Sequence, residues 1–138
     1  MARNGFRMTQ LSRGRGLTRR ERAMRGRKPL RHQLEGRRTI KRAALRDCGR
    51  RCVYCGDRLE LETATLDHVY PRAKGGPNLP GNLVPACVTC NQMKADMLPF
   101  EFFARYPWAG ENFVRYARTV HRSLKRGARR ALSLAMAA

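Results

Sequence analysis

Two C-x-x-C pairs constrain this 138-residue chain more than any other feature of its sequence. Cys52 and Cys55 form the first pair, and Cys87 and Cys90 form the second. This spacing lets each pair hold a tetrahedral ion from a tight turn, which predicts a structural Zn²⁺ site with four thiolate ligands. The 31 residues between the pairs exceed the about 15–20 of a compact zinc ribbon, so folded structure must fill the gap. Cys48, the fifth cysteine, is predicted to be a small thiol rather than a ligand.

The charge of the chain, +20 in total, is distributed unevenly. Residues 1–42 hold 15 basic and 2 acidic residues, residues 43–111 hold 8 of each, and residues 112–138 hold 7 basic residues and no acidic one. We therefore predict a basic, largely extended arm at 1–42, a folded core at 43–111 and a basic amphipathic helix at 112–138. Two basic flanks around a neutral core favour a polyanionic partner, which predicts binding to nucleic acid.

Membrane and secretory classes are not indicated by the sequence. No apolar stretch of about 18 residues is present, and the N-terminal region lacks the apolar run of a secretory signal. We expect an intracellular, cytoplasmic protein without a membrane partner, in which cysteines serve as metal ligands more often than as disulfides. An organellar transit peptide and a membrane-surface helix remain alternative interpretations of the two flanks. The oligomeric state is left open.

The segment between the cysteine pairs predicts a small α+β unit. Residues 59–71 contain β-branched and alternating residues and are expected to form a strand that a proline stops. Residues 73–81 have the composition of a loop, residues 82–87 are expected to form a short second strand, and residues 91–96 to open a helix. The predicted order is strand, loop, strand, helix, with zinc at the base.

Two further helices are predicted outside this unit. Apolar residues at 40–45 can share one face of a short helix that starts near Glu35. Phe113, Ala117, Val120 and Leu124 recur at helical spacing, and Gly127 is expected to interrupt that helix. The aromatic residues that precede this second helix are expected to form core: Phe100, Phe102, Phe103, Tyr106 and Trp108.

Five separate motifs resemble the HNH endonuclease family. They are C-x-x-C-G at 52–56, D-H-x-x-P at 67–71, G-G at 75–76, N-L-V at 82–84 and C-x-x-C-N-x-x-K at 87–94. Order, spacing and residue chemistry agree at all five places, over about half of the chain. The resemblance implies a ββα-metal fold, stapled here by the predicted zinc, and a nuclease activity.

Phosphodiester hydrolysis requires a base and a cation, and the motif region offers both. His68 is the predicted general base, because imidazole accepts a proton near neutral pH. Asp67 and Asn91 supply the hard oxygen atoms that suit Mg²⁺ or Mn²⁺. The resemblance implies the same roles, and it adds Asn82 as the residue that holds the loop and orients His68. Strict strand alternation would send Asp67 and His68 to opposite faces, so we expect the strand to twist or end there.

The sequence therefore predicts a metal-dependent HNH endonuclease that hydrolyses DNA phosphodiester bonds, by nicking or by double-strand cleavage. Double-stranded DNA is the expected partner. A non-catalytic, zinc-stapled nucleic-acid-binding module is the alternative, and an RNA-associated component is a further one. The residues expected to contact nucleic acid are Lys94, Arg72, Lys74, Arg115, Arg118 and Arg122.

Overall fold

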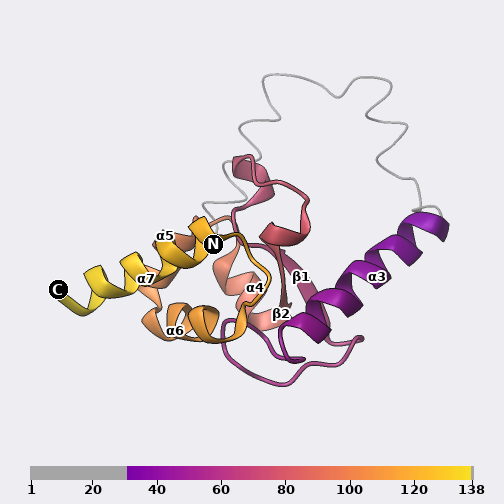
Figure 1. Ribbon diagram of the computed structural model, residues 1–138, viewed down its shortest axis with the longest axis horizontal. Coiled ribbons are helices and arrows are strands. Elements are labelled where there is room, and N and C mark those ends of the chain that lie inside the picture. Colours follow the sequence, from indigo (N-terminus) through magenta and orange to yellow (C-terminus); the bar gives the residue numbers. More distant parts are fainter. Residues whose placement is uncertain (1–30, 138) are drawn as a thin grey trace. The chain divides into compact units, whose positions relative to one another are not determined.

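The computed structural model describes residues 31–137, with side chains from residue 36 onward, so most of the predicted N-terminal arm lies outside the described residues. The features below belong to the unit formed by residues 35–138. A two-stranded antiparallel sheet lies between helix α3 (Arg31–Asp47) and a group of C-terminal helices (Figure 1). None of the helices within residues 31–137 has the length and apolar character needed to cross a membrane.

The predicted strand, loop, strand, helix order is confirmed. Strand β1 (Ala64–His68) pairs antiparallel with β2 (Leu83–Cys87), and helix α4 (Val88–Lys94) packs on both strands. Two one-turn 3₁₀ helices, at Arg72–Lys74 and Pro80–Asn82, lie in the connecting loop.

The observed ends of these elements differ from the predicted ones for local reasons. The first strand begins at Ala64, because Thr63 closes a turn on Glu60, whose backbone N–H donates to the Thr63 hydroxyl at 3.0 Å. Helix α4 begins at Val88 rather than at residue 91. The thiol sulfur of Cys87 accepts a hydrogen bond from the Cys90 N–H and so caps the first turn. The second cysteine pair therefore starts the helix.

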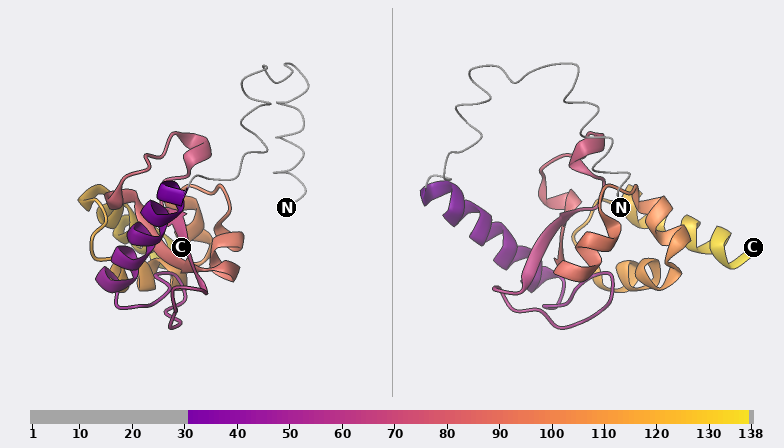
Figure 2. Two further views of the ribbon diagram at one scale, coloured as in Figure 1. Left: turned by 90° about the vertical axis from the view of Figure 1, so that its right-hand side faces the viewer. Right: turned by 180° about the vertical axis from the view of Figure 1, so that it is seen from behind.

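Three helices form the layer beyond the sheet, and each contacts the other two: α5 (Pro99–Arg105), α6 (Pro107–Tyr116) and α7 (Arg122–Ala137). Figure 2 shows this layer from two further directions. Its aromatic side chains meet the Tyr54 ring, whose centroid lies 5.2 Å from that of Phe102 and 6.1 Å from that of Phe113. The loop of the first cysteine pair is thus part of the main core.

The prediction of one continuous C-terminal helix is wrong. Helix α6 ends at Tyr116, Ala117 is extended, and α7 starts at Arg122. The His121 N–H donates to the Gly81 carbonyl at 2.9 Å, which ties the break to the sheet loop. Of the apolar residues at helical spacing, Phe113 lies on α6 and Leu124 on α7, while Ala117 and Val120 lie in the bend between these helices. Gly127 lies inside α7 and does not interrupt it.

Both predicted domain boundaries fall inside helices. The boundary after residue 42 lies within α3, so residues 31–42 are helical and not extended, and the boundary after residue 111 lies within α6. The side chain of Phe113, beyond the second boundary, is fully buried. Phe100 and Trp108 are 56% and 41% exposed, which corrects their predicted place in the core.

Two helical glycines allow a direct test of this packing. A Cβ atom at Gly110 in α6 would lie 3.1 Å from the Phe103 Cβ and 2.9 Å from a Leu132 methyl carbon, whereas a Cβ atom at Gly127 meets nothing within 4 Å. We expect Gly110→Ala to lower the free energy of unfolding by about 1 kcal/mol or more through overpacking. Gly127→Ala should raise it by about 0.5–1 kcal/mol through helix propensity. Urea denaturation of both variants measures the two signs, and equal effects would contradict the packing described.

Candidate nuclease and metal site

The structure brings together the four cysteines that the sequence predicted as ligands. The sulfur atoms of Cys52, Cys55, Cys87 and Cys90 all lie within 4.8 Å of one another, and those of Cys55 and Cys87 are 3.9 Å apart. Four sulfurs at about 2.3 Å from a tetrahedral Zn²⁺ stand about 3.8 Å from each other, so the donor set fits this ion. No other group of three or more His, Cys, Asp or Glu residues in the described part of the chain could hold a metal.

The pKa values of these thiols shift in opposite directions. The hydrogen bond from Cys90 lowers the pKa of Cys52 to about 5, while burial raises the pKa of Cys55 to about 12. The same hydrogen bond to Cys52 raises the pKa of Cys90. Four thiolates so close together need a cation, and a bound metal requires them deprotonated. Cys48 is buried outside this cluster, and its pKa is raised by burial.

Three of the four residues predicted for the catalytic site line one cleft of about 190 Å³, and the fourth, Asn82, does not line it. Asp67 and His68 come from the end of β1, and Asn91 comes from α4. Arg72 and Asp96 lie on the same cleft wall. The strand ends at His68, which lets two adjacent residues reach one cleft despite strand alternation.

Asp67 is held by two donors on a single oxygen. The Tyr54 hydroxyl donates to Asp67 Oδ2 at 2.5 Å, and the Lys94 ammonium lies 3.3 Å from the same atom. Burial raises the pKa of Asp67, and the charge of Lys94 opposes that rise. Oδ1 has no hydrogen-bond partner among the described residues, so this oxygen remains for a cation.

The His68 ring is oriented by the loop that follows β1. Its Nε2 atom lies 3.1 Å from Asn78 Oδ1, and because that oxygen only accepts, Nε2 carries the hydrogen and Nδ1 the lone pair. The side chain of Asn82 accepts from the Tyr70 N–H and donates to the carbonyls of Tyr70 and Pro77 at 2.8–3.0 Å. Asn82 therefore ties together the two ends of the loop that carries Asn78.

The amide of Asn91 is oriented by the sheet. Its Nδ2 donates to the Thr65 hydroxyl at 2.9 Å, and that hydroxyl donates to the Ala86 carbonyl at 2.7 Å. The Asn91 Oδ1 atom is left as a hard oxygen donor. Together with Asp67 Oδ1 it suits Mg²⁺ or Mn²⁺, which commonly take only one or two protein ligands and complete their shell with water and phosphate.

The predicted phosphate contact of Lys94 is wrong in this structure. Lys94 is 0% exposed, and its ammonium donates to the His68 carbonyl at 2.9 Å as well as pairing with Asp67. Burial lowers its pKa, and Asp67 counteracts this. The side chain supports the site from inside and offers no surface to a phosphate. Arg72 is exposed and lines the cleft, and Lys74 is exposed and donates to the carbonyl of Asp96, a residue of the cleft lining, at 2.7 Å.

Of the other predicted basic residues, Arg115 lies on α6, Arg122 on α7 and Arg118 in the bend between these helices. Arg115 is exposed and stands over the Tyr116 ring, 5.9 Å from its centroid. A cationic cleft of about 330 Å³ is lined by Arg118, Arg122, Lys125, Arg126, Arg129 and Val120. Sequence analysis did not include Lys125, Arg126 and Arg129 among the residues expected to contact nucleic acid. The spacing of positions 122, 125, 126 and 129 nevertheless places them on one helical face.

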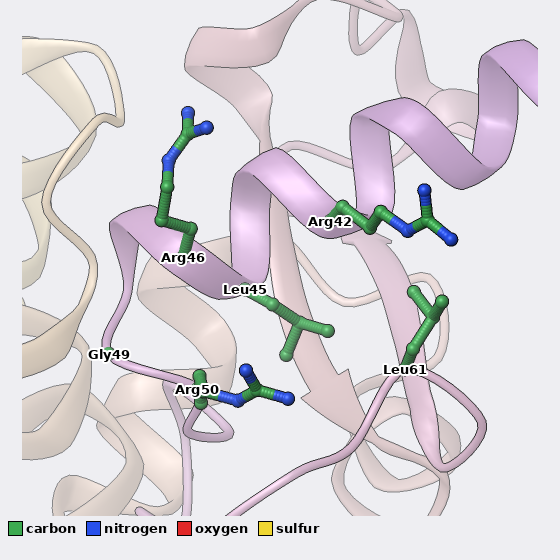
Figure 3. Close-up of a pocket in the computed structure, with 6 residues that line it drawn as sticks. All are labelled: Arg42, Leu45, Arg46, Gly49, Arg50 and Leu61. Atoms are coloured by element: carbon green, nitrogen blue, oxygen red, sulfur yellow. The ribbon is translucent and has the colours of Figure 1, made fainter.

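A third hollow, of about 620 Å³, lies beside α3 and is lined by Arg42, Leu45, Arg46, Gly49, Arg50 and Leu61 (Figure 3). Arg46 points away from the two leucines in this view. Glu60 pairs with Arg50 at 3.0 Å, and Asp47 pairs with Arg46 at 3.2 Å. The hollow shares no residue with the cleft of Asp67 and His68.

Sequence analysis also missed three residues that hold the site: Tyr54, Thr65 and Asn78. Tyr54 carried a usable signal, because a tyrosine between two predicted metal ligands is expected to be buried and must then find a partner for its hydroxyl. Thr65 and Asn78 carried none, since their partners lie 26 and 10 residues away in sequence.

Part of the chain is similar in sequence to known endonucleases. Residues 52–106 match the HNH endonuclease family. Over 55 residues the chain is 42% identical to the CRISPR-associated endonuclease Cas9 of Actinomyces naeslundii. The match covers 39% of this chain and 5% of that relative. The crystal structure of the Type II-C Cas9 enzyme from the same organism aligns with a TM-score of 0.49 and 24% identity, over 96% of this chain and 15% of that one.

The cysteine cluster generates a prediction about metal content and stability. We expect the purified protein to hold one zinc ion, and Cys90→Ser to lose it and to lower the free energy of unfolding by about 3 kcal/mol or more. Zinc is measured by mass spectrometry of the metal, and stability by urea denaturation. Cys48→Ala is the matched control and should keep its zinc. Loss of zinc in both variants, or in neither, would contradict the assigned ligand set.

Proposed function

We propose that this protein is a metal-dependent endonuclease that hydrolyses DNA phosphodiester bonds at the cleft formed by Asp67, His68 and Asn91. The observation that carries the proposal is the convergence of one imidazole and two free oxygen donors on that cleft. The match of residues 52–106 to the HNH endonuclease family supports the same reaction class.

His68 acts as the general base. Its Nδ1 lone pair takes a proton from the attacking water, while the hydrogen bond from Nε2 to Asn78 keeps the ring oriented. Asp67 and Asn91 would hold a divalent ion, which would supply positive charge to stabilise the charge that develops during hydrolysis. Asn82 keeps the loop closed beneath the ring. The two oxygen donors favour Mg²⁺ or Mn²⁺ over softer ions.

Double-stranded DNA is the proposed substrate. The relative with the matching segment is named an endonuclease, and this chain adds a strongly basic surface to that segment. Arg72 and Lys74 contact phosphates next to the cleft, while Arg115, Arg118 and Arg122 contact the backbone farther away. Phosphate contacts position a duplex without reading its sequence, so weak sequence preference follows.

Cleavage of supercoiled plasmid tests the reaction. Zinc-loaded protein should convert the plasmid to open-circular or linear form when Mg²⁺ or Mn²⁺ is added. His68→Ala should lower the rate by about 10²–10⁴-fold, because the general base is removed. His121→Ala is the matched control, since His121 is exposed and lies outside the cleft, and it should cleave at the wild-type rate.

Equal rates for wild type and His68→Ala would contradict the assigned base. If both proteins are inert with either metal on double-stranded DNA, single-stranded DNA and RNA, the enzyme proposal fails. DNA binding without cleavage would then favour the non-catalytic zinc-stapled module.

The cationic cleft on α7 generates a prediction about DNA binding. None of its arginines has an ion pair among the described residues, and burial together with Arg129 lowers the pKa of Lys125. In the His68→Ala background, Arg122→Gln with Arg126→Gln should weaken DNA binding about tenfold. A plot of the logarithm of the DNA-binding constant against the logarithm of the salt concentration should also become less steep. Its slope should fall by about 1 for each phosphate that the protein no longer neutralises. Fluorescence anisotropy across a salt series measures both quantities.

The matched control for this measurement removes the same charge elsewhere. Arg105 and Arg130 are exposed and lie outside the cleft, so Arg105→Gln with Arg130→Gln should change the affinity and the slope much less. Equal effects of the two double variants would show that net charge, and not the cleft, determines binding.

A further inference from the structure

A buried group of three side chains joins the cysteine cluster to the candidate cleavage site. Tyr54 and Lys94 are both 0% exposed, and Asp67 is 5% exposed. The Tyr54 hydroxyl and the Lys94 ammonium both contact Asp67 Oδ2, at 2.5 and 3.3 Å. Tyr54 lies in the chain between Cys52 and Cys55, so its backbone is part of the loop that carries two metal ligands.

We propose that Tyr54 is a positioning residue that fixes the Asp67 carboxylate for the divalent ion and makes that position depend on the zinc-bound loop. This inference rests on the proposed function, because it assigns Tyr54 a role toward the ion that Asp67 and Asn91 hold.

A carboxylate can rotate about its bond to Cβ, and each rotation changes the oxygen that faces the cleft. Two donors on Oδ2 oppose this rotation and leave Oδ1 as the free oxygen. Groups that orient a metal ligand through hydrogen bonds typically change metal affinity or activity by about 10–100-fold when they are removed. The Tyr54 hydroxyl is the shorter of the two contacts.

The position of the Tyr54 hydroxyl is in turn set by its surroundings. The ring packs against Phe102 in an edge arrangement and lies parallel to Phe113. The Tyr54 carbonyl accepts from Asn112 Nδ2 at 2.8 Å, and the Val53 N–H donates to the Pro85 carbonyl at 3.2 Å. The loop is therefore tied to α6 and to β2, and its two cysteines add the ties through the metal. Release of the zinc ion removes the latter ties and should loosen Asp67.

Tyr54→Phe is the direct test, because it removes the hydroxyl and keeps the ring in the core. We expect this variant to retain one zinc ion and unchanged DNA affinity. Its affinity for Mn²⁺ in the absence of DNA, measured by electron paramagnetic resonance, should fall about 10-fold or more. In cleavage assays the Mn²⁺ concentration for half-maximal rate should rise by a similar factor, with the rate largely restored at saturating Mn²⁺. A role in folding alone would not move the metal dependence.

Tyr106→Phe is the matched control. Tyr106 belongs to the same aromatic layer, with its ring centroid 5.5 Å from that of Phe102, and makes no contact with Asp67 among the described residues. It should bind Mn²⁺ as wild type does. Unchanged Mn²⁺ affinity in Tyr54→Phe overturns the proposal, and so does loss of zinc from Tyr54→Phe, which would make Tyr54 a structural support of the zinc loop.

A double-mutant cycle separates this inference from the proposed function. In an Asp67→Ala background, Tyr54→Phe should cause no further fall in Mn²⁺ affinity, and an undiminished further fall would overturn the role assigned to Tyr54. If Asp67→Ala and Tyr54→Phe each lower the Mn²⁺ affinity but wild type cleaves no substrate, the positioning role stands and the nuclease proposal fails. If wild type cleaves and Tyr54→Phe keeps its Mn²⁺ dependence, only the positioning role fails.

Discussion

The meeting of four thiol sulfurs is the interaction on which the rest of this structure depends. It joins two cysteine pairs that 31 residues separate, and so closes the segment that contains β1, most of β2 and the loop between them. Cys87 serves three purposes at once, because it offers a sulfur to the cluster, ends β2 opposite Ala64 and caps α4. A two-stranded sheet has little stability of its own in water, so this closure is needed to hold it.

The position of Asp67 sets stability against function, and the buried side chains of Tyr54 and Lys94 resolve this conflict. A carboxylate placed in the core beneath an open cleft is destabilised by desolvation. Lys94 supplies a compensating charge, and the Tyr54 hydroxyl supplies a hydrogen bond. Lys94 also donates to the His68 carbonyl, so one buried ammonium supports the backbone of the proposed base and the side chain of the proposed metal ligand. An apolar side chain at position 94 would pack as well but would leave the Asp67 carboxylate without a positively charged partner.

The local parts of the site could be predicted because the interactions that form them are close in sequence. Each C-x-x-C turn is made by a backbone N–H that donates to a sulfur three residues earlier. The strand pair and α4 also follow from short patterns. The errors concern partners distant in sequence. Phe113 and Val120 keep a helical period although the chain bends between them, because the Gly81 carbonyl binds the His121 N–H there. Lys94 reads as a surface lysine until its partners, 26 and 27 residues earlier, are known.

What the sequence by itself determined is the chemistry available: four thiols at ligand spacing, an Asp-His pair, two asparagines and two basic flanks. Residue type and short spacing suffice for this, since side-chain chemistry is intrinsic and tight turns are local. Only the tertiary structure decided which oxygen of Asp67 is free, that Lys94 faces inward, and that a tyrosine of the cysteine loop contacts the carboxylate. These outcomes depend on how the loop, the sheet and α4 pack against one another, and no local pattern encodes that packing.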